Sequence, residues 1–173
     1  EIGIGSNNIK AVYVDEQKSL VYIGTHAGGL TVLHRNSGQM ESFNQLNSQL
    51  VNENVYAILP DKEGSILLGT LSALVSFNPE KRSFTTIDKE KDGTPFTSQR
   101  ITILFRDSRK RLWIGGEEGI SVFQQEGIEI EKAPILPESS VTKMFTNCIY
   151  EAANGIIWVG TREGFYCFNE KEK

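Results

Sequence analysis

The sequence of 173 residues predicts an all-β fold built from four copies of one unit. A segment that contains an anchor glycine recurs as VYIGT, LLGT, LWIGG and WVGT, with the glycines at Gly24, Gly69, Gly115 and Gly160. The glycines are spaced by 45, 46 and 45 residues, and a fixed period of this size is typical of repeat architectures. Short runs rich in Val, Ile, Tyr, Phe and Trp alternate with Gly, Asn, Asp and Lys clusters, as strands alternate with turns. No longer stretch has helical periodicity.

Each unit is predicted to hold four strands. The first is IKAVYVD (9–15), VYAILPD (55–61), ITILFRD (101–107) or TNCIYEA (146–152). The second carries the anchor glycine, the third ends at Phe or Leu, and QMESF, SFTTI and GIEIE supply a fourth. Four short antiparallel strands per unit of this length form the blade of a β-propeller. We predict a single propeller segment over 1–173, with blades at about 8–45, 54–90, 100–132 and 146–173, and with 1–6 as an outer strand that lacks its own blade.

The apolar second strands predict how the blades pack. Inner strands that are covered on both faces have continuous apolar runs, as in LWIG and IWVG. We therefore expect Trp113 and Trp158 to fill the space between adjacent blades; the alternative is a surface on which sugars stack. The anchor glycines allow either close backbone approach or unusual torsion angles. A phosphate-binding loop would need a helix after the glycine-rich turn, and none is expected.

Composition limits the function classes. The net charge of −4 and the pI near 5.3 give no support for nucleic-acid binding. No apolar run reaches the roughly 18 residues of a membrane helix, so we expect no membrane contact by this segment. The chain begins at Glu1 without a signal peptide, so we expect a processed product or a piece of a longer chain.

The two cysteines, Cys148 and Cys167, lie in apolar strand-like runs. We expect buried free thiols, since their spacing does not support a disulfide. Neither lies in a cluster with the spacing of metal ligands, so no metal site is predicted.

The unit resembles the two-component regulator propeller repeat, in which an apolar strand ending in Asp is followed by LWIGT, a glycine turn and Phe-Asp or Phe-Asn. The matching residues are Asp15, Asp61, Asp107, the EGI and EGF turns, Phe77-Asn78 and Phe168-Asn169. The copies depart from the pattern at Leu67 for Trp, Ala73 for Gly, Gly116 for Thr and Ala152 for Asp. The resemblance covers nearly the whole chain in four copies.

This resemblance implies a segment of the sensor region of hybrid two-component regulators, which are common in gut Bacteroidetes. Such sensors are periplasmic parts of membrane-anchored proteins, detect oligosaccharides and have more than four blades. We therefore expect a four-blade fragment that is a non-catalytic sensor or ligand-binding segment. The alternatives are a protein-interaction or structural segment without a small ligand and, less favoured, a glycan-processing enzyme.

The candidate ligand-binding residues lie in two sets of loops that open on one face of a propeller: the turns after the anchor glycines and the connections between blades. Binding residues concentrate on such loops, although loops also need polar residues merely to stay solvated. A glycosidase would need two carboxylates about 5–9.5 Å apart, which sequence adjacency does not establish. No catalytic residue and no cofactor is predicted. The candidates are His26, Asn52, Asn54, Gln99, Arg100, Glu117, Glu118, Arg162 and Glu163.

The number of blades predicts an association between chains. Blades from a ring of about seven open by about 50° each, so four cover about 206°, whereas a ring of four needs about 90° per blade. We therefore expect a homodimer of eight blades at about 45° each, joined through blade edges, in which residues 1–5 complete the partner's last blade. A monomeric ring and an open arc are the alternatives.

Overall fold

A computed structural model of the chain describes residues 3–94, 100–117, 119–126, 129–132 and 144–169. These residues form fifteen strands and one short 3-10 turn at Lys62–Gly64, without an α-helix among them. No helix within these ranges is therefore long and apolar enough to cross a membrane.

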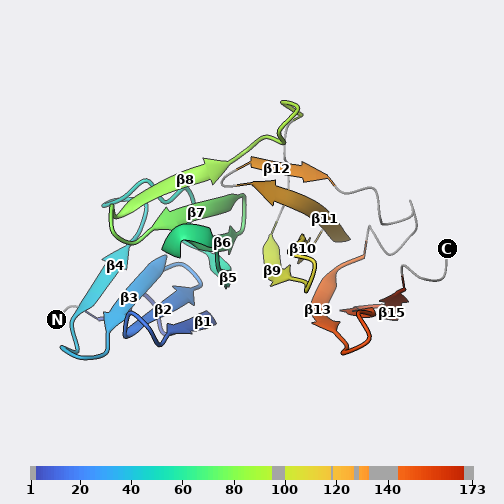
Figure 1. Ribbon diagram of the computed structural model, residues 1–173. Helices are drawn as coiled ribbons and strands as arrows, with labels where there is room; N and C mark the ends of the chain where they lie inside the picture. Colours follow the sequence, from blue (N-terminus) through green and yellow to red (C-terminus); the bar gives the residue numbers. More distant parts are fainter. Residues whose placement is uncertain (1–2, 95–99, 118, 127–128, 133–143, 170–173) are drawn as a thin grey trace.

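The strands form four antiparallel sheets, which we call blades one to four (Figure 1). Blade one holds β1 (Ile9–Asp15), β2 (Leu20–Thr25), β3 (Leu30–His34) and β4 (Met40–Phe43). Blade two holds β5 (Val55–Pro60), β6 (Ile66–Thr70), β7 (Leu74–Asn78) and β8 (Ser83–Ile87). Blade three holds β9 (Ile101–Arg106), β10 (Leu112–Gly116), β11 (Gly119–Glu126) and β12 (Glu129–Lys132). Blade four holds β13 (Thr146–Glu151), β14 (Ile157–Thr161) and β15 (Gly164–Phe168).

The blades follow one another along an arc, with blades one and four at its two ends (Figure 1). Strand order within each blade follows the sequence, and the first strands β1, β5, β9 and β13 contact one another in that order. The predicted all-β propeller fold is confirmed. Blade four contributes three strands among the described residues.

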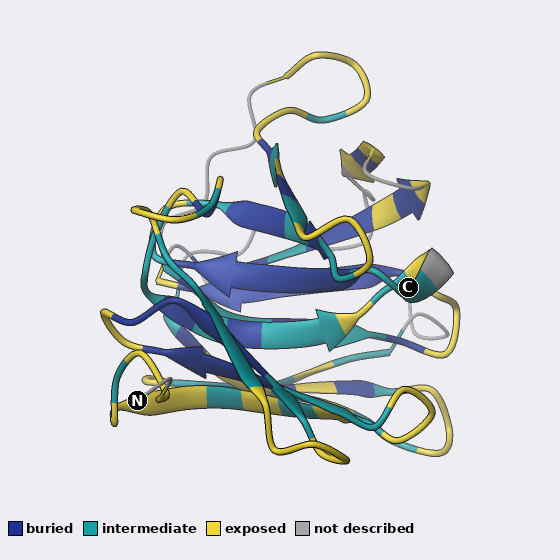
Figure 2. Ribbon diagram, turned by 90° about the vertical axis from the view of Figure 1, so that its left-hand side faces the viewer, coloured by how far each residue is buried: buried dark blue, intermediate teal, exposed yellow. Residues whose placement is uncertain are grey.

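The hydrophobic core lies between the blades rather than within them. One cluster joins blades one and two around Tyr22 and Phe77, the next joins blades two and three around Leu67 and Leu112, and the third joins blades three and four around Trp113. Buried residues accordingly gather along the strands and exposed ones at the turns (Figure 2). Each blade is thus stabilised mainly by the apolar surface that it buries against its neighbours.

The anchor glycines allow this stacking by close approach. A Cβ on Gly24 would come within 2.8 Å of the Val55 carbonyl oxygen, and one on Gly69 within 2.8 Å of the Ile101 carbonyl oxygen. Each of these neighbours is the first residue of the next blade. None of the four anchor glycines has a positive φ, so close packing rather than torsional freedom requires glycine here.

Blade four corrects two of the sequence predictions. Trp113 is 1% exposed and packs against Phe168 of blade four, as predicted, but Trp158 at the equivalent position is 38% exposed. The cysteines are free, also as predicted, but exposed rather than buried. Cys167 pairs with Trp158 and Cys148 with Gly160, so all of these side chains lie on the face of blade four that points away from blade three. No described blade packs on that face.

The opening segment is also corrected. Residues 3–6 form no strand, and residues 1–2 lie outside the described part. The Ser42 hydroxyl donates to the Gly3 carbonyl at 3.1 Å, and a Cβ on Gly5 would come within 2.2 Å of the Gly28 carbonyl oxygen. The segment therefore packs on blade one itself. Its exchange between two chains stays a prediction.

The two tryptophans give a direct test of the interblade core. We expect Trp113→Ala to lower the free energy of unfolding by about 3–5 kcal/mol, because it empties a buried site and removes the 2.8 Å hydrogen bond from Nε1 to Asp107. Trp158→Ala should cost about 1 kcal/mol or less. Urea unfolding followed by circular dichroism measures both, and equal losses would contradict this assignment.

Gly116 departs from the repeat for a steric reason that can be tested. In the other blades a threonine hydroxyl closes the turn, as Thr70 does by donating to the Ala73 carbonyl at 2.8 Å. A Cβ on Gly116 would lie 2.1 Å from the Arg100 carbonyl oxygen. We therefore expect Gly116→Thr to destabilise the chain by about 1–3 kcal/mol although it restores the repeat pattern. An unchanged or raised melting temperature for this variant would contradict the steric reason.

Tyr22 occupies the tryptophan position in blade one, and its buried hydroxyl has no hydrogen-bond partner among the described residues. Burial, followed by the nearby Asp15 charge, raises the pKa of Tyr22 to about 12. The stability that this shift confers is complete below pH 10 and is lost as the pH rises toward 12. We expect Tyr22→Phe to match or exceed the parent at pH 7, since it removes an unsatisfied buried group, with a difference that grows between pH 10 and 11. Thermal melts across that range measure it, and a less stable variant would refute it.

Candidate ligand-binding site

The first strand of every blade carries a β-bulge at its second residue. In blade one Ile9 pairs with Thr25 and Ala11 with Gly24, so that the residue between them has no partner, and the same skip recurs in the other three blades. Bulges re-aim the side chain of the extra residue and often occur beside binding sites. The four bulge residues are Lys10, Tyr56, Thr102 and Asn147.

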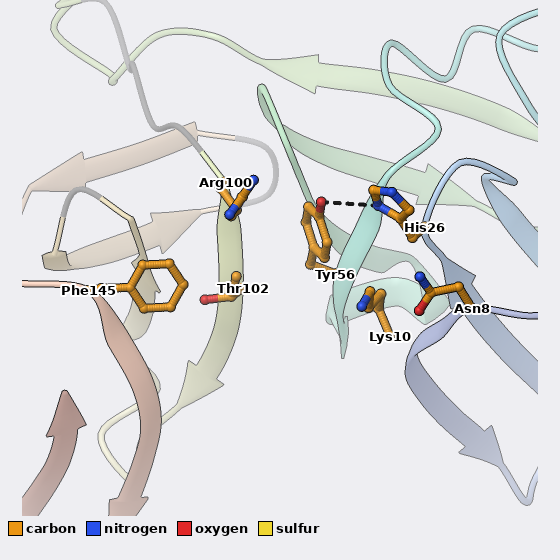
Figure 3. Close-up of a pocket in the computed structure, with 7 residues that line it drawn as sticks. All are labelled: Asn8, Lys10, His26, Tyr56, Arg100, Thr102 and Phe145. Atoms are coloured by element: carbon orange, nitrogen blue, oxygen red, sulfur yellow. Dashed lines mark hydrogen bonds between the residues drawn. The ribbon is translucent and has the colours of Figure 1, made fainter. Parts of the chain in front are cut away.

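Three bulge residues line an open pocket of about 410 Å³ at the start of the first strands (Figure 3). This volume lies in the usual range for ligand sites, about 300–1,000 Å³. The residues just before β1, β9 and β13 complete the lining together with one turn residue of blade one. All four blades therefore contribute to the pocket, through Asn8, Lys10, His26, Tyr56, Arg100, Thr102 and Phe145.

One backbone hydrogen bond, repeated in every blade, fixes the pocket rim. The second residue after the anchor glycine donates its N–H to the carbonyl of the residue before the first strand: His26 to Asn8 at 2.8 Å in blade one and Arg162 to Phe145 at 3.2 Å in blade four. This bond holds the turn and the interblade connection on the same face. The rim is therefore set by backbone geometry, whatever side chains it carries.

Three planar side chains lie next to one another along one wall of the pocket. The Tyr56 hydroxyl lies 3.4 Å from His26 Nδ1, and the Arg100 guanidinium lies over the Tyr56 ring, with Cζ 5.9 Å from its centroid (Figure 3). Arg100 has a left-handed backbone (φ 47°), and its N–H donates to the Leu71 carbonyl at 2.8 Å. Arg100 Nε lies 3.6 Å from Glu117 Oε2, just beyond hydrogen-bond distance.

Phe145 forms a second aromatic surface across the pocket. Its ring carries the Arg162 guanidinium, with Cζ 4.1 Å from the centroid. Beside it, the Thr102 hydroxyl donates to the Thr146 carbonyl at 3.3 Å. Figure 3 places Phe145 and Thr102 opposite Tyr56 and Lys10.

The predicted candidates are distributed unevenly. His26 and Arg100 line the pocket, Arg162 stacks on Phe145, and Glu117 lies beside Arg100. Two other candidates hold a loop together: the side-chain oxygen of Asn54 accepts from the Ala27 N–H at 3.1 Å, while its amide donates to Asn52 Oδ1 at 3.0 Å. The side chain of Glu163 is exposed outside the lining. Gln99 and Glu118 lie outside the described residues.

Sequence reasoning missed the bulge residues Lys10, Tyr56 and Thr102, and also Asn8 and Phe145. A signal was present: the second position of each first strand is Lys, Tyr, Thr or Asn, between neighbours that are mostly apolar. A polar or amphipathic residue at the same place in every copy of a buried strand indicates a side chain that points away from the core.

The pocket combines two aromatic surfaces with amide, hydroxyl, imidazole and cationic groups. The described lining includes no carboxylate, and hence no acidic pair of the kind that hydrolyses glycosidic bonds. Over the described ranges no group of three His, Cys, Asp or Glu side chains is arranged to hold a metal ion. The described groups suit binding of a polar ligand.

The profile of the two-component regulator propeller family matches residues 95–118 and 138–163. A protein named histidine kinase P4 of Formosa agariphila is 27% identical over 145 residues, which are 78% of this chain and 11% of that protein. The chain thus spans about a tenth of this relative.

Solved structures share the fold. The extracellular domain of a system described as hybrid two-component, from B. thetaiotaomicron, superposes with a TM-score of 0.75 at 22% identity, over 99% of this chain and 23% of that one. A second extracellular domain from the same organism superposes with a TM-score of 0.76 at 19% identity, over 97% of this chain and 22% of that one. An ancestral GH74 enzyme superposes with a TM-score of 0.69 at 16% identity, over 97% of this chain and 24% of that one.

Residues 95–118 and 138–163 thus match the two-component regulator propeller family, and the four glycine-anchored repeats form four stacked blades.

Proposed function

We propose that this segment is a non-catalytic, ligand-binding part of the periplasmic sensor of a hybrid two-component system, and that its pocket binds an oligosaccharide. The observation that carries the proposal is the convergence of bulge residues from successive blades on one pocket. The similarity to a named histidine kinase and to extracellular domains of two-component systems supports the sensor assignment and the location outside the cytoplasm.

The pocket chemistry matches a sugar. A pyranose ring offers an apolar C–H face that packs on an aromatic ring, and hydroxyl groups that need donors and acceptors in the ring plane. Tyr56 and Phe145 supply the aromatic faces, while Asn8, Lys10 and Thr102 supply polar groups around them. Well-placed polar groups within a mostly preformed site give such pockets their specificity.

Because the pocket is built from four blades, a bound ligand would bridge them. A ligand that contacts both Tyr56 of blade two and Phe145 of blade four favours one arrangement of the blades over others. A preference of this kind between two arrangements is sufficient to transmit binding to a more distant part of a protein.

A glycan-processing enzyme is the second candidate, and the structural similarity to a GH74 enzyme is what favours it. Propellers host both binding and catalysis, so the fold does not decide between them. The described pocket lining lacks the pair of carboxylates that hydrolysis requires, which favours binding.

We expect the chain to bind oligosaccharides in calorimetric titrations against a glycan panel, and Tyr56→Ala and Phe145→Ala each to weaken binding at least tenfold by removing an aromatic face. Tyr150→Ala is the matched control, because Tyr150 lies in β13, is 67% exposed and is absent from the pocket lining. Absence of binding to every glycan would favour a purely structural segment. An equal effect of Tyr150→Ala would place the site elsewhere, and cleavage of a glycan would favour the enzyme.

A further inference from the structure

We propose that the oligosaccharide bound in the pocket is anionic, carrying carboxylate or sulfate groups that Lys10 and Arg100 recognise. The inference rests on the proposed function and names its ligand class. Its basis is a reversal of charge: the whole chain carries −4, whereas the described lining holds the cations Lys10 and Arg100 and no acidic side chain.

Lys10 is a cation with a structural reason to face the ligand. It is the bulge residue of β1, in register between Ile9 and Ala11, so its side chain leaves the alternation that packs the rest of the strand. It is exposed and forms no ion pair with any described residue. An aliphatic or neutral polar residue would satisfy the fold equally well at this position.

Arg100 is a second cation, held in place but incompletely paired. Its guanidinium lies over the Tyr56 ring, and its backbone is fixed by the bond to the Leu71 carbonyl. Its Nε is buried without a hydrogen-bond partner in the described structure, and the nearest carboxylate, Glu117, is 3.6 Å away and half exposed. A planar guanidinium in this state offers N–H donors that suit a carboxylate or sulfate.

Four basic side chains elsewhere on the described surface lie closer to a carboxylate than Arg100 does. Arg35 bonds Glu16, Arg82 lies 2.9 Å from Glu41, Arg106 lies 2.9 Å from Asp61 and Lys91 lies 3.4 Å from Glu126. In the pocket, by contrast, Lys10 has no carboxylate partner among the described residues, and Arg100 Nε lies 3.6 Å from Glu117.

Figure 3 shows Lys10 and Arg100 on opposite sides of Tyr56. Lys10 comes from blade one, Tyr56 from blade two and Arg100 from just before blade three. An acidic sugar bound beside Tyr56 would thus have cations from two parts of the chain within the same pocket. Neutral sugars would leave the donors of Arg100 without an acceptor, at a cost in affinity.

The test is calorimetric titration of the chain with charge-matched pairs of probes: trigalacturonate against its fully methyl-esterified form, and sulfated against desulfated carrageenan oligosaccharides. We expect at least one acidic member to bind tenfold or more tightly than its neutral form in 50 mM salt. Because salt screens exposed charges, the preference should shrink in 500 mM salt. The carboxylate and sulfate arms distinguish the two anion sources.

Substitutions in the pocket test whether the preference for acidic probes arises there. Lys10→Gln and Arg100→Gln should each reduce the preference for the acidic form by about threefold or more, whereas Arg100→Lys should retain part of it. Lys81→Gln is the control, since Lys81 is an exposed cation outside the pocket lining.

The outcomes separate this inference from the function on which it rests. Equal binding of acidic and neutral forms, or a preference that survives both pocket variants, overturns the inference and leaves oligosaccharide binding intact. A failure of all probes, together with the wider glycan panel, overturns both.

Discussion

Stacking of one blade on the next is the interaction on which the rest of this structure depends. A blade on its own has no core: the three hydrophobic clusters each take residues from two neighbouring blades. The close approach that this requires is made possible by the anchor glycine, against which Val55, Ile101 and Thr146 of the following blades pack. The contact between neighbouring blades therefore recurs along the sequence with the same period as the sheet itself.

The same contact explains why a pocket forms where it does. The first residues of β5, β9 and β13 pack against the preceding blade, and the very next residue is the bulge. Tyr56 follows Val55 and Thr102 follows Ile101, so each of these two pocket residues is positioned by a close packing contact of its blade. A pocket side chain beside a rigid contact has less conformational freedom, so ordering it on binding would cost less free energy.

The sequence predicted the fold well because repetition averages out local ambiguity: four copies agree where one would be weak evidence. It failed where burial depends on the neighbour rather than on the strand, as for Trp158, Cys148 and Cys167, whose apolar runs look like those of a covered blade. His26 and Arg100 were predicted from their loops. Lys10, Tyr56 and Thr102 were not, because a bulge leaves no mark on an apolar pattern except one polar residue at a constant position.

The aspartate that follows the first strand has different polar partners in blades two and three. Asp107 accepts from Trp113 Nε1 at 2.8 Å and from Arg111 Nε at 2.6 Å within blade three, whereas Asp61 bonds Arg106 and Gln125 of the next blade. These buried carboxylates are paired, as buried charges must be, and they lie at the end of the first strand, whereas the pocket lies at its start. The paired carboxylates and the pocket thus lie at opposite ends of the first strands. The bulge residues differ between the copies, whereas the stacking contacts at the anchor glycines recur.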